Sequence, residues 1–220
     1  MKKLLAGCIL AFSVLAASTA MAQTYPSKPI RWLAPYPAGG GSDFLARTIG
    51  QQLSTQTGQT VLVDNKPGAN TAVAAAETAR APADGYTVLS ADNGTMVFNP
   101  VLYKSLAYSP TKDLAPVTLM GRFPMILVVN PESGITDAKA FIDKAKASST
   151  GINYASAGAG SPHHLAMELL KVETGLRLVH VPYRGAAPAL ADLVSGQVPA
   201  MMVDLAAGAS FIKGGKVRPL

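Results

Sequence analysis

The sequence predicts an α/β fold of two lobes. Strand-like apolar runs alternate with helix-like patterns along most of the chain, which is typical of sheets covered by helices. One long β-compatible stretch, residues 119–130, interrupts this alternation and contains Gly121 and Pro124, which suits a crossing between lobes. A chain of 220 residues is long enough for one large domain or two lobes. We place the first lobe at residues 23–122 and the second at residues 123–220.

The first 22 residues have the pattern of a cleavable secretory signal. Two lysines precede an apolar run at residues 9–17, and an Ala-Met-Ala ending follows at residues 20–22. Cleavage after Ala22 leaves 220 − 22 = 198 residues and 19 − 2 = 17 basic against 13 acidic side chains, so the formal charge falls from +6 to +4. It also removes Cys8, the single cysteine, and with it any disulfide or thiolate chemistry. We therefore expect a periplasmic protein that is stabilised by a packed core.

The first lobe is predicted to alternate strands and helices. In chain order the elements are a strand at residues 30–34, a helix from Phe44 to Gly58, a strand at 61–63, an Ala-rich helix at 71–80, and a strand at 86–90 after the Asp84-Gly85 turn. Short loops between such elements favour parallel pairing through right-handed crossovers. Ligand sites are then expected beyond the carboxyl ends of the strands.

The second lobe repeats this rhythm after residues 119–130. The expected elements are a helix capped by Thr136 or Asp137 that runs through Ala147, a strand at 152–155, a helix at 163–172, a strand at 178–181, a helix at 187–194 closed by Gly196, and strands at 198–203 and 217–220. The chain therefore ends on a predicted strand.

A Gly-rich loop follows the first strand and leads directly into a helix. Glycines let the backbone approach a ligand, and the free N–H groups of a first helical turn can bind an anion. The loop is not a phosphate loop, because it lacks the Walker lysine and places an acid next to the helix start, and it lacks the third glycine of a dinucleotide site. A plain capped turn is the alternative. The candidate binding residues here are Tyr36, Gly39, Gly40, Gly41, Ser42 and Asp43.

A second Gly-rich loop joins a strand to a helix in the other lobe. Ser161 occupies the N-cap position and Pro162 the first helical position, where a missing donor costs nothing. Each lobe thus offers one Gly-rich helix N-terminus, and two such ends that face each other would clamp a carboxylate. The candidates in this loop are Ser156, Gly158, Gly160, Ser161 and His163.

The histidines raise two further hypotheses that the residues support poorly. His164 and Glu168 share a helical face, but the His-Glu-x-x-His pattern of a zinc protease is absent, so no metal site is expected. A hydrolase with a Ser161 nucleophile and His163 or His164 as base lacks the G-x-S-x-G elbow. In the alternative interpretation, one histidine lines the cleft or caps the helix while the other packs.

Other loop residues could contribute polar contacts to a ligand. Arg184 could offer a bidentate fork to a carboxylate, or it could be an exposed loop residue. Asn93 and Thr95 could donate hydrogen bonds, or they could belong to a simple turn. Asp204 could accept from an amine or water, or it could cap a helix. The basic residues are scattered, which argues against a nucleic-acid partner.

Together these motifs resemble the tripartite tricarboxylate transporter substrate-binding proteins, also called the Bug family of periplasmic receptors. The resemblance extends in order along the whole mature chain. It is carried by YPSKPI at residues 25–30, PYPAGGGSDFLAR at 35–47, DNKPGA at 64–69, ADGYTVL at 83–89, NYASAGAGSPHHLAMELLK at 153–171, HVPYRGAAPALADLVSGQV at 180–198 and GGKVRPL at 214–220.

This resemblance implies a bilobal periplasmic-binding-protein fold that captures a small carboxylated solute in its interlobe cleft. Binding would use backbone amides and ordered waters at residues 36–43 and 156–161, without a cofactor and without catalysis. The expected partners are membrane transporter subunits or a sensor domain, and we expect a monomer. Because family members continue past the strand at 217–220, the resemblance also implies a shortened C-terminus. A secreted serine hydrolase and a non-binding fragment remain open as alternatives.

Overall fold

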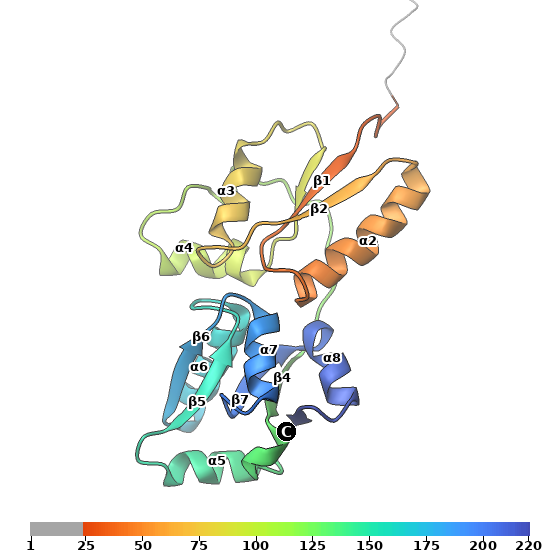
Figure 1. The fold of residues 1–220 in the computed structure, drawn as a ribbon. Helices are drawn as coiled ribbons and strands as arrows, with labels where there is room; N and C mark the ends of the chain where they lie inside the picture. The colour runs from red at the N-terminus through yellow and green to blue at the C-terminus, as the bar shows by residue number, and fades with distance from the viewer. Residues whose placement is uncertain (1–23) are drawn as a thin grey trace, which may run out of the picture.

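The computed structural model describes residues 24–220 (Figure 1). The predicted signal sequence and Cys8 lie outside these residues. The described chain forms two α/β lobes, one above the other in Figure 1, which confirms the predicted fold class. Within residues 24–220, no helix combines the length and the apolar character needed to cross a membrane.

The first lobe is built on a three-stranded parallel sheet. Its strands are β1 (Ile30–Ala34), β2 (Val61–Asn65) and β3 (Thr87–Leu89), in the order β2-β1-β3. Helix α2 (Gly41–Thr57) joins β1 to β2, and α3 (Ala72–Arg80) joins β2 to β3. These five elements match the predicted ones within a few residues.

The two helices of this lobe cover opposite faces of the sheet. Successive side chains of a strand point to opposite faces. Trp32 lies beside Gly50 of α2, whereas the guanidinium of its neighbour Arg31 pairs with Glu77 of α3 at 2.6 Å. The central strand β1 is therefore buried on both sides, and Leu33 has no exposed surface.

Beyond β3 the chain forms two short helices that the apolar pattern does not predict. A π-helix, η2 (Gly94–Phe98), runs into α4 (Asn99–Leu102). A buried polar network holds this segment: the Asn99 amide donates to the Asn70 carbonyl at 2.6 Å, and the Tyr108 hydroxyl donates to the Thr95 carbonyl at 2.7 Å. Polar anchors of this kind leave no hydrophobic periodicity in the sequence.

The second lobe contains a mixed five-stranded sheet. Its strands are β4 (Met125–Val129), β5 (Ile152–Ser156), β6 (Leu178–Pro182), β7 (Ala200–Asp204) and β8 (Arg218–Pro219), in the order β6-β5-β7-β4-β8. Strand β5 is parallel to β6 and β7, but β4 is antiparallel to both β7 and β8. The crossing segment therefore supplies a strand, β4, that runs antiparallel to both of its neighbours, while the strand–helix–strand units around β5 pair in parallel.

Four helices cover this sheet, and alternating residues divide the core between its two faces. The helices are α5 (Ala138–Ala147), α6 (Pro162–Thr174), α7 (Ala186–Val194) and α8 (Leu205–Lys213). Val128 packs in the cluster that includes residues of α7 and α8, whereas its neighbour Val129 packs with Phe141 of α5 and Met167 of α6. Of these four helices, α8 has no counterpart among the expected elements, although the alternative expectation that Asp204 caps a helix is confirmed at its start.

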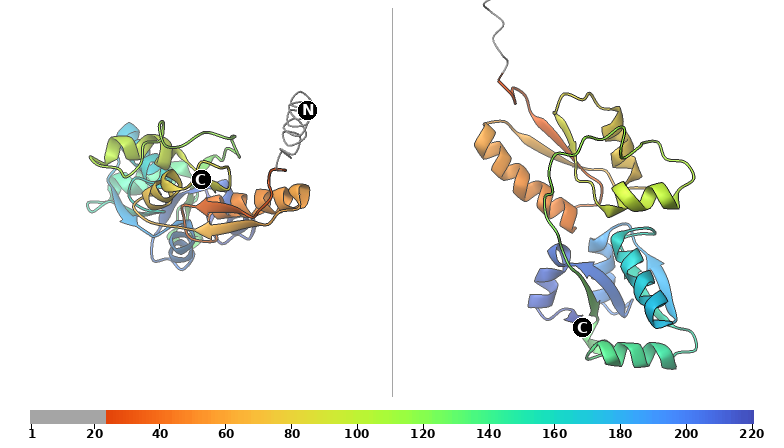
Figure 2. Two further views of the ribbon diagram at one scale, coloured as in Figure 1. Left: turned by 90° about the horizontal axis from the view of Figure 1, so that it is seen from above. Right: turned by 180° about the vertical axis from the view of Figure 1, so that it is seen from behind.

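Residues 103–124 link the two lobes and contain no helix or strand. The view from behind in Figure 2 shows this segment running down from the first lobe into β4. The strands of the first sheet end at Leu89, and those of the second sheet begin at Met125. The exact boundary between the lobes near residue 122 remains a prediction.

Candidate functional site between the two lobes

Each lobe presents a Gly-rich helix N-terminus at the carboxyl end of a strand. Helix α2 starts after Gly40, an extended residue that cannot supply a side-chain cap. Helix α6 starts after Ser161, whose hydroxyl accepts from the His164 N–H at 3.3 Å. The first-turn N–H groups of α2 therefore lack a side-chain acceptor and can bind an anion.

The two lobes meet at these loops. A β-carbon on Gly41 would lie 2.4 Å from Oδ1 of Asp204, and one on Gly160 would lie 2.8 Å from Nδ2 of Asn70. A β-carbon on Gly185 would lie 2.8 Å from Cδ of Pro37. Since real β-carbons do not approach other atoms so closely, glycine at these positions permits the contact between lobes (Figure 1).

Asp204 and His163 form a hydrogen-bonded contact in the second lobe beside the first Gly-rich loop. Oδ2 of Asp204 lies 3.1 Å from Nε2 of His163, and Oδ1 accepts from the Ala207 N–H at 2.9 Å as the N-cap of α8. Burial opposes the charged form of Asp204, but hydrogen bonds from His163 and the backbone outweigh it and lower its pKa. Asp204 is thus an ionised, rigidly held carboxylate at the interlobe contact.

Three buried polar atoms around this contact have no hydrogen-bond partner among the described residues: Oγ of Ser42, Oδ1 of Asn70 and Nδ1 of His163. They belong to residues that neighbour the contacts of Gly41, Gly160 and Asp204. Buried polar groups are normally paired, so three unpaired ones in one place are suited to pairing with a ligand or with water. Their position between the lobes agrees with the predicted location of the cleft.

Asp43 organises the first loop from within. Its carboxylate accepts from the Gly39 N–H at 3.1 Å, from Nε of Arg47 at 3.0 Å and from the Asn65 amide at 2.9 Å. Burial would raise the pKa of this carboxyl, but these hydrogen bonds, with Arg47 foremost, lower it. All of these partners belong to the first lobe, so the carboxylate shapes the loop that carries the glycines.

Tyr36 connects the first loop to both lobes. Its hydroxyl donates to Asp92 at 2.8 Å, while its ring packs against the α7–α8 core cluster of the second lobe. Burial, followed by the charge of Asp92, raises the pKa of this phenol well above its ordinary value. Asp92 also accepts from the N–H and the hydroxyl of Thr95 at 2.8 and 3.0 Å. Thr95 is fully buried in this network, whereas Asn93 is exposed.

The remaining predicted residues divide between a buried and an exposed position. Ser156 is fully buried, and its hydroxyl lies 2.6 Å from Nε2 of His180 and 3.1 Å from the backbone of Gly158. Ser156 therefore supports the second loop from below. Arg184 is exposed and makes no side-chain hydrogen bond or ion pair within residues 24–220.

Sequence reasoning did not select Asn70 and Asp92. Asn70 lies against Gly160 of the second lobe, and Asp92 accepts from the hydroxyl of Tyr36, which packs on the second lobe. Asn70 directly follows the DNKPGA loop, and Asp92 lies in the loop after β3. Each occupies the carboxyl-end edge of a parallel sheet, where ligand sites gather. Their position in the segments that follow predicted strands of the first lobe could have identified both residues as candidates.

The geometry supports neither the hydrolase nor a metal site. Ser161 caps α6, His163 faces Asp204 and His164 accepts from the Gly160 N–H at 3.1 Å, so no Ser161–imidazole hydrogen bond occurs in the described chain. Residues 24–220 also contain no cluster of three or more side chains that could ligate a metal ion. Within residues 24–220 a close Ser–His pair is formed by Ser156 and His180, and the Ser156 side chain in it is fully buried.

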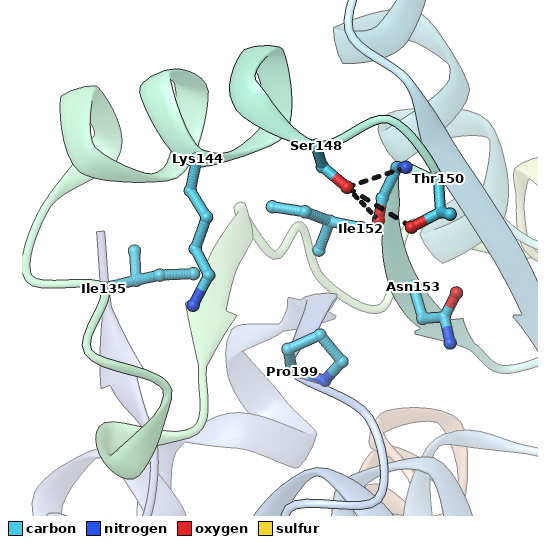
Figure 3. A pocket seen from close by; sticks show the side chains of 8 residues that line it. Ile135, Lys144, Ser148, Thr150, Ile152, Asn153 and Pro199 are labelled. Carbon is cyan, nitrogen blue, oxygen red and sulfur yellow. Dashed lines mark hydrogen bonds between the residues drawn. The ribbon is translucent and has the colours of Figure 1, made fainter.

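A surface pocket of about 330 Å³ lies elsewhere, at the opposite end of β5 from the Gly-rich loop. Figure 3 shows it between Lys144 of α5, Ile152 at the start of β5 and Pro199. Its polar lining side chains are exposed or only partly buried, and the Lys144 amine donates to the Ser133 carbonyl. The candidate site is therefore the contact between the lobes.

Comparison with known proteins agrees with this architecture. Residues 45–220 match the family described as tripartite tricarboxylate transporter family receptor. The protein BugT of Bordetella pertussis is 35% identical over 223 residues, covering 100% of this chain and 68% of BugT. A structure from R. palustris solved with adipate has 34% identity and a TM-score of 0.87, and it covers 89% of this chain and 66% of that one.

A second solved structure is similar to the same extent. MatC from Rhodopseudomonas palustris, with bound malate, has 30% identity and a TM-score of 0.82, again covering 89% of this chain and 66% of that one. This chain therefore spans about two thirds of the length of these relatives. Both the matched family and the relatives extend over most of the chain, including both lobes. The chain belongs to the tripartite tricarboxylate transporter family of receptors, which includes the Bug proteins.

Proposed function

We propose that this chain is a solute-binding receptor that captures a small carboxylate between its two lobes and has no catalytic activity. The observation that carries this proposal is that both Gly-rich helix N-termini lie at the contact between the lobes: Gly41 of α2 lies against Asp204, which pairs with His163 of α6, beside three buried, unpartnered polar atoms. The adipate and malate in the two related structures are both carboxylates, which supports the same ligand class.

Donors for a carboxylate come from both sides of the contact. The first lobe offers the N–H groups at the start of α2 and the unpaired hydroxyl of Ser42. The second lobe offers the backbone N–H of His163 in the first turn of α6, since Pro162 has no N–H and the His164 N–H already pairs with Ser161. Such donors recognise an anion without a cationic side chain in contact with it. A solute bridging both sets stabilises the closed arrangement of the lobes.

Two groups restrict what the rest of the solute can be. Oδ1 of Asn70 accepts hydrogen bonds, so it requires a hydroxyl, an amine or a water on the solute side. The ionised Asp204 repels a second carboxylate placed beside it. We propose direct contacts for Ser42, Asn70 and His163, and a supporting role for Tyr36, Asp43, Thr95 and Ser156.

The setting of this receptor follows from its family. BugD, a solved relative with 31% identity, is a periplasmic binding protein. We propose that this chain also acts in the periplasm as a monomer and delivers its solute to membrane transporter subunits or to a sensor domain. Exposed Arg184 next to the contact between lobes would then be available to such a partner.

Binding is tested by thermal unfolding and calorimetry of residues 23–220 with adipate and malate, and with their diamides as neutral controls. At a ligand concentration of 100 times the dissociation constant, linkage gives about 2.7 kcal/mol of stabilisation and a rise of roughly 5–10 °C in the unfolding midpoint. A rise with the acids alone supports the proposal. A cooperative transition that no carboxylate in a broad panel moves contradicts it.

The variant Ser42→Ala identifies the site. Because Oγ of Ser42 has no protein partner, its removal costs no intramolecular hydrogen bond, and the unfolding midpoint without ligand should stay the same. A lost hydrogen bond to a charged ligand costs about 1.5–3 kcal/mol, so the affinity should fall by about 10-fold or more. Ser210→Ala, at an exposed position of α8, is the matched control and should bind like the parent.

A further inference from the structure

Three aromatic rings stack beneath the second Gly-rich loop. The rings of His164 and His180 have centroids 4.0 Å apart at an interplanar angle of 25°, and Tyr154 stacks on His180 at 5.1 Å. Helix α6 contributes His164, while β6 and β5 contribute the other two rings. We call these three residues the ring stack. None of them is among the groups proposed above to contact the solute.

The ring stack holds the loop at two points. At one end, Nε2 of His180 lies 2.6 Å from the hydroxyl of Ser156, which also pairs with the backbone of Gly158. At the other end, the N–H of Gly160 donates to Nδ1 of His164 at 3.1 Å. Residues 157–160, which precede the α6 N-terminus, are thereby held between two imidazoles.

The second contact determines the protonation of His164. A backbone N–H is always a donor, so Nδ1 must carry a lone pair and the ring proton must reside on Nε2. A protonated imidazolium has N–H groups on both nitrogens, and donor would then face donor at Gly160. Only the neutral ring provides this hydrogen bond.

Several charged and titratable groups around the ring stack influence the protonation of His164. From α6 itself come Glu168, which accepts from the Tyr154 hydroxyl at 2.6 Å, and Lys171, which pairs with Glu168 at 3.1 Å. From the sheet come Tyr154 and His180. Burial lowers the pKa of His164, and burial followed by the charge of His164 lowers that of His180 to about 4. The two stacked rings are thus both neutral near pH 7, and the first proton taken up opposes the second.

We propose that His164 is a positioning residue for solute capture: its neutral ring holds the Gly160 N–H and orients the second Gly-rich loop, so that protonation of the ring releases the loop and weakens binding. This inference rests on the function proposed above. Gly160 lies against Asn70 of the first lobe, so its position directly affects how the lobes meet. Loss of one net hydrogen bond corresponds to a drop in affinity of about 3- to 10-fold.

The test compares the parent with His164→Asn from pH 7.5 to pH 4.5. The amide oxygen of asparagine can accept from Gly160 near the position of Nδ1 but does not titrate. Adipate affinity is measured by calorimetry at each pH, and the Gly160 amide resonance is followed by NMR in the ligand-free protein. Both proteins bind the same adipate and retain His163. Any effect of protonating adipate or His163 therefore cancels in the ratio of the two affinities. His164→Leu, which removes the acceptor at every pH, serves as the second variant.

We expect the Gly160 amide of the parent to shift as His164 titrates, and the affinity of the parent to fall about 3- to 10-fold more than that of His164→Asn. His164→Leu should bind weakly already at pH 7.5. Identical affinity profiles for parent and His164→Asn, or a Gly160 amide that does not respond to His164, overturn the proposal. Failure of every protein to bind adipate, malate or any other carboxylate of the panel at pH 7.5, with an intact amide response, refutes the carboxylate function and leaves the hydrogen bond established.

Discussion

Replacing Gly41 with alanine should weaken solute binding without unfolding either lobe. The added β-carbon would lie 2.4 Å from Oδ1 of Asp204, about 1 Å inside an ordinary van der Waals contact. Asp204 cannot retreat, because the Ala207 N–H and the His163 ring hold its two oxygens. The lobes must therefore separate, and overpacking of this kind costs about 1–3 kcal/mol. If closure is required for binding, the affinity falls about 5- to 150-fold.

Gly40→Ala is the matched control in the same loop. Its β-carbon would meet nothing closer than the Pro37 carbonyl at 3.9 Å, and its extended backbone accommodates any residue. Carboxylate affinity is measured by calorimetry, and the separation of the lobes by small-angle scattering with saturating ligand. Equal affinities for Gly41→Ala and Gly40→Ala would refute the reasoning that the closed contact between α2 and Asp204 contributes to binding.

Three further outcomes follow from the packing and the titrating groups. Phe141→Ala empties a fully buried site and should destabilise the second lobe by about 3–5 kcal/mol in denaturant titrations, whereas Val172→Ala, 77% exposed, should change it by less than about 0.5. Because the folded-state pKa of His180 is about 4, below its ordinary 6.5, its contribution to stability is complete above pH 6.5 and is lost as the pH falls toward 4. After discounting for partial exposure of the ring, the free energy of unfolding lost over this pH range is roughly 1–2 kcal/mol. The prediction is contradicted if the unfolding midpoint of His180→Gln depends on pH as strongly as that of the parent. Ser161→Ala removes the α6 cap and should cost about 1 kcal/mol of stability. Esterase turnover that this variant abolishes would revive the hydrolase hypothesis.

The secondary structure could be predicted where local rules suffice. A short apolar run marks β1, apolar residues at helical spacing mark α2, and Gly58 ends α2 in the left-handed conformation that glycine favours. Asp137 caps α5 as predicted, by accepting from the Ala140 N–H. In each case the decisive interactions span only a few residues, so the local sequence records them.

The elements and strand pairings that local pattern does not predict depend on contacts that are distant in the chain. Helix α4 is anchored by Asn99, whose amide reaches the Asn70 carbonyl, and β4 pairs antiparallel with β7 across about seventy residues. Neither contact produces a hydrophobic period in its own segment. The orientation of β4 is a consequence of how the crossing segment enters the second lobe, which local pattern does not encode.

For the site, the sequence by itself determined the two Gly-rich helix N-termini, because glycine, serine and proline at these positions have direct backbone consequences. Only the tertiary structure decided which residues meet between the lobes. It turned Asp43 and Ser156 inward as supports, brought Asn70 and Asp204 to the contact, and placed His164 under Gly160. The physical reason is that a side chain's role depends on the partners that folding brings within hydrogen-bond distance, and those partners lie on elements of separate sequence origin.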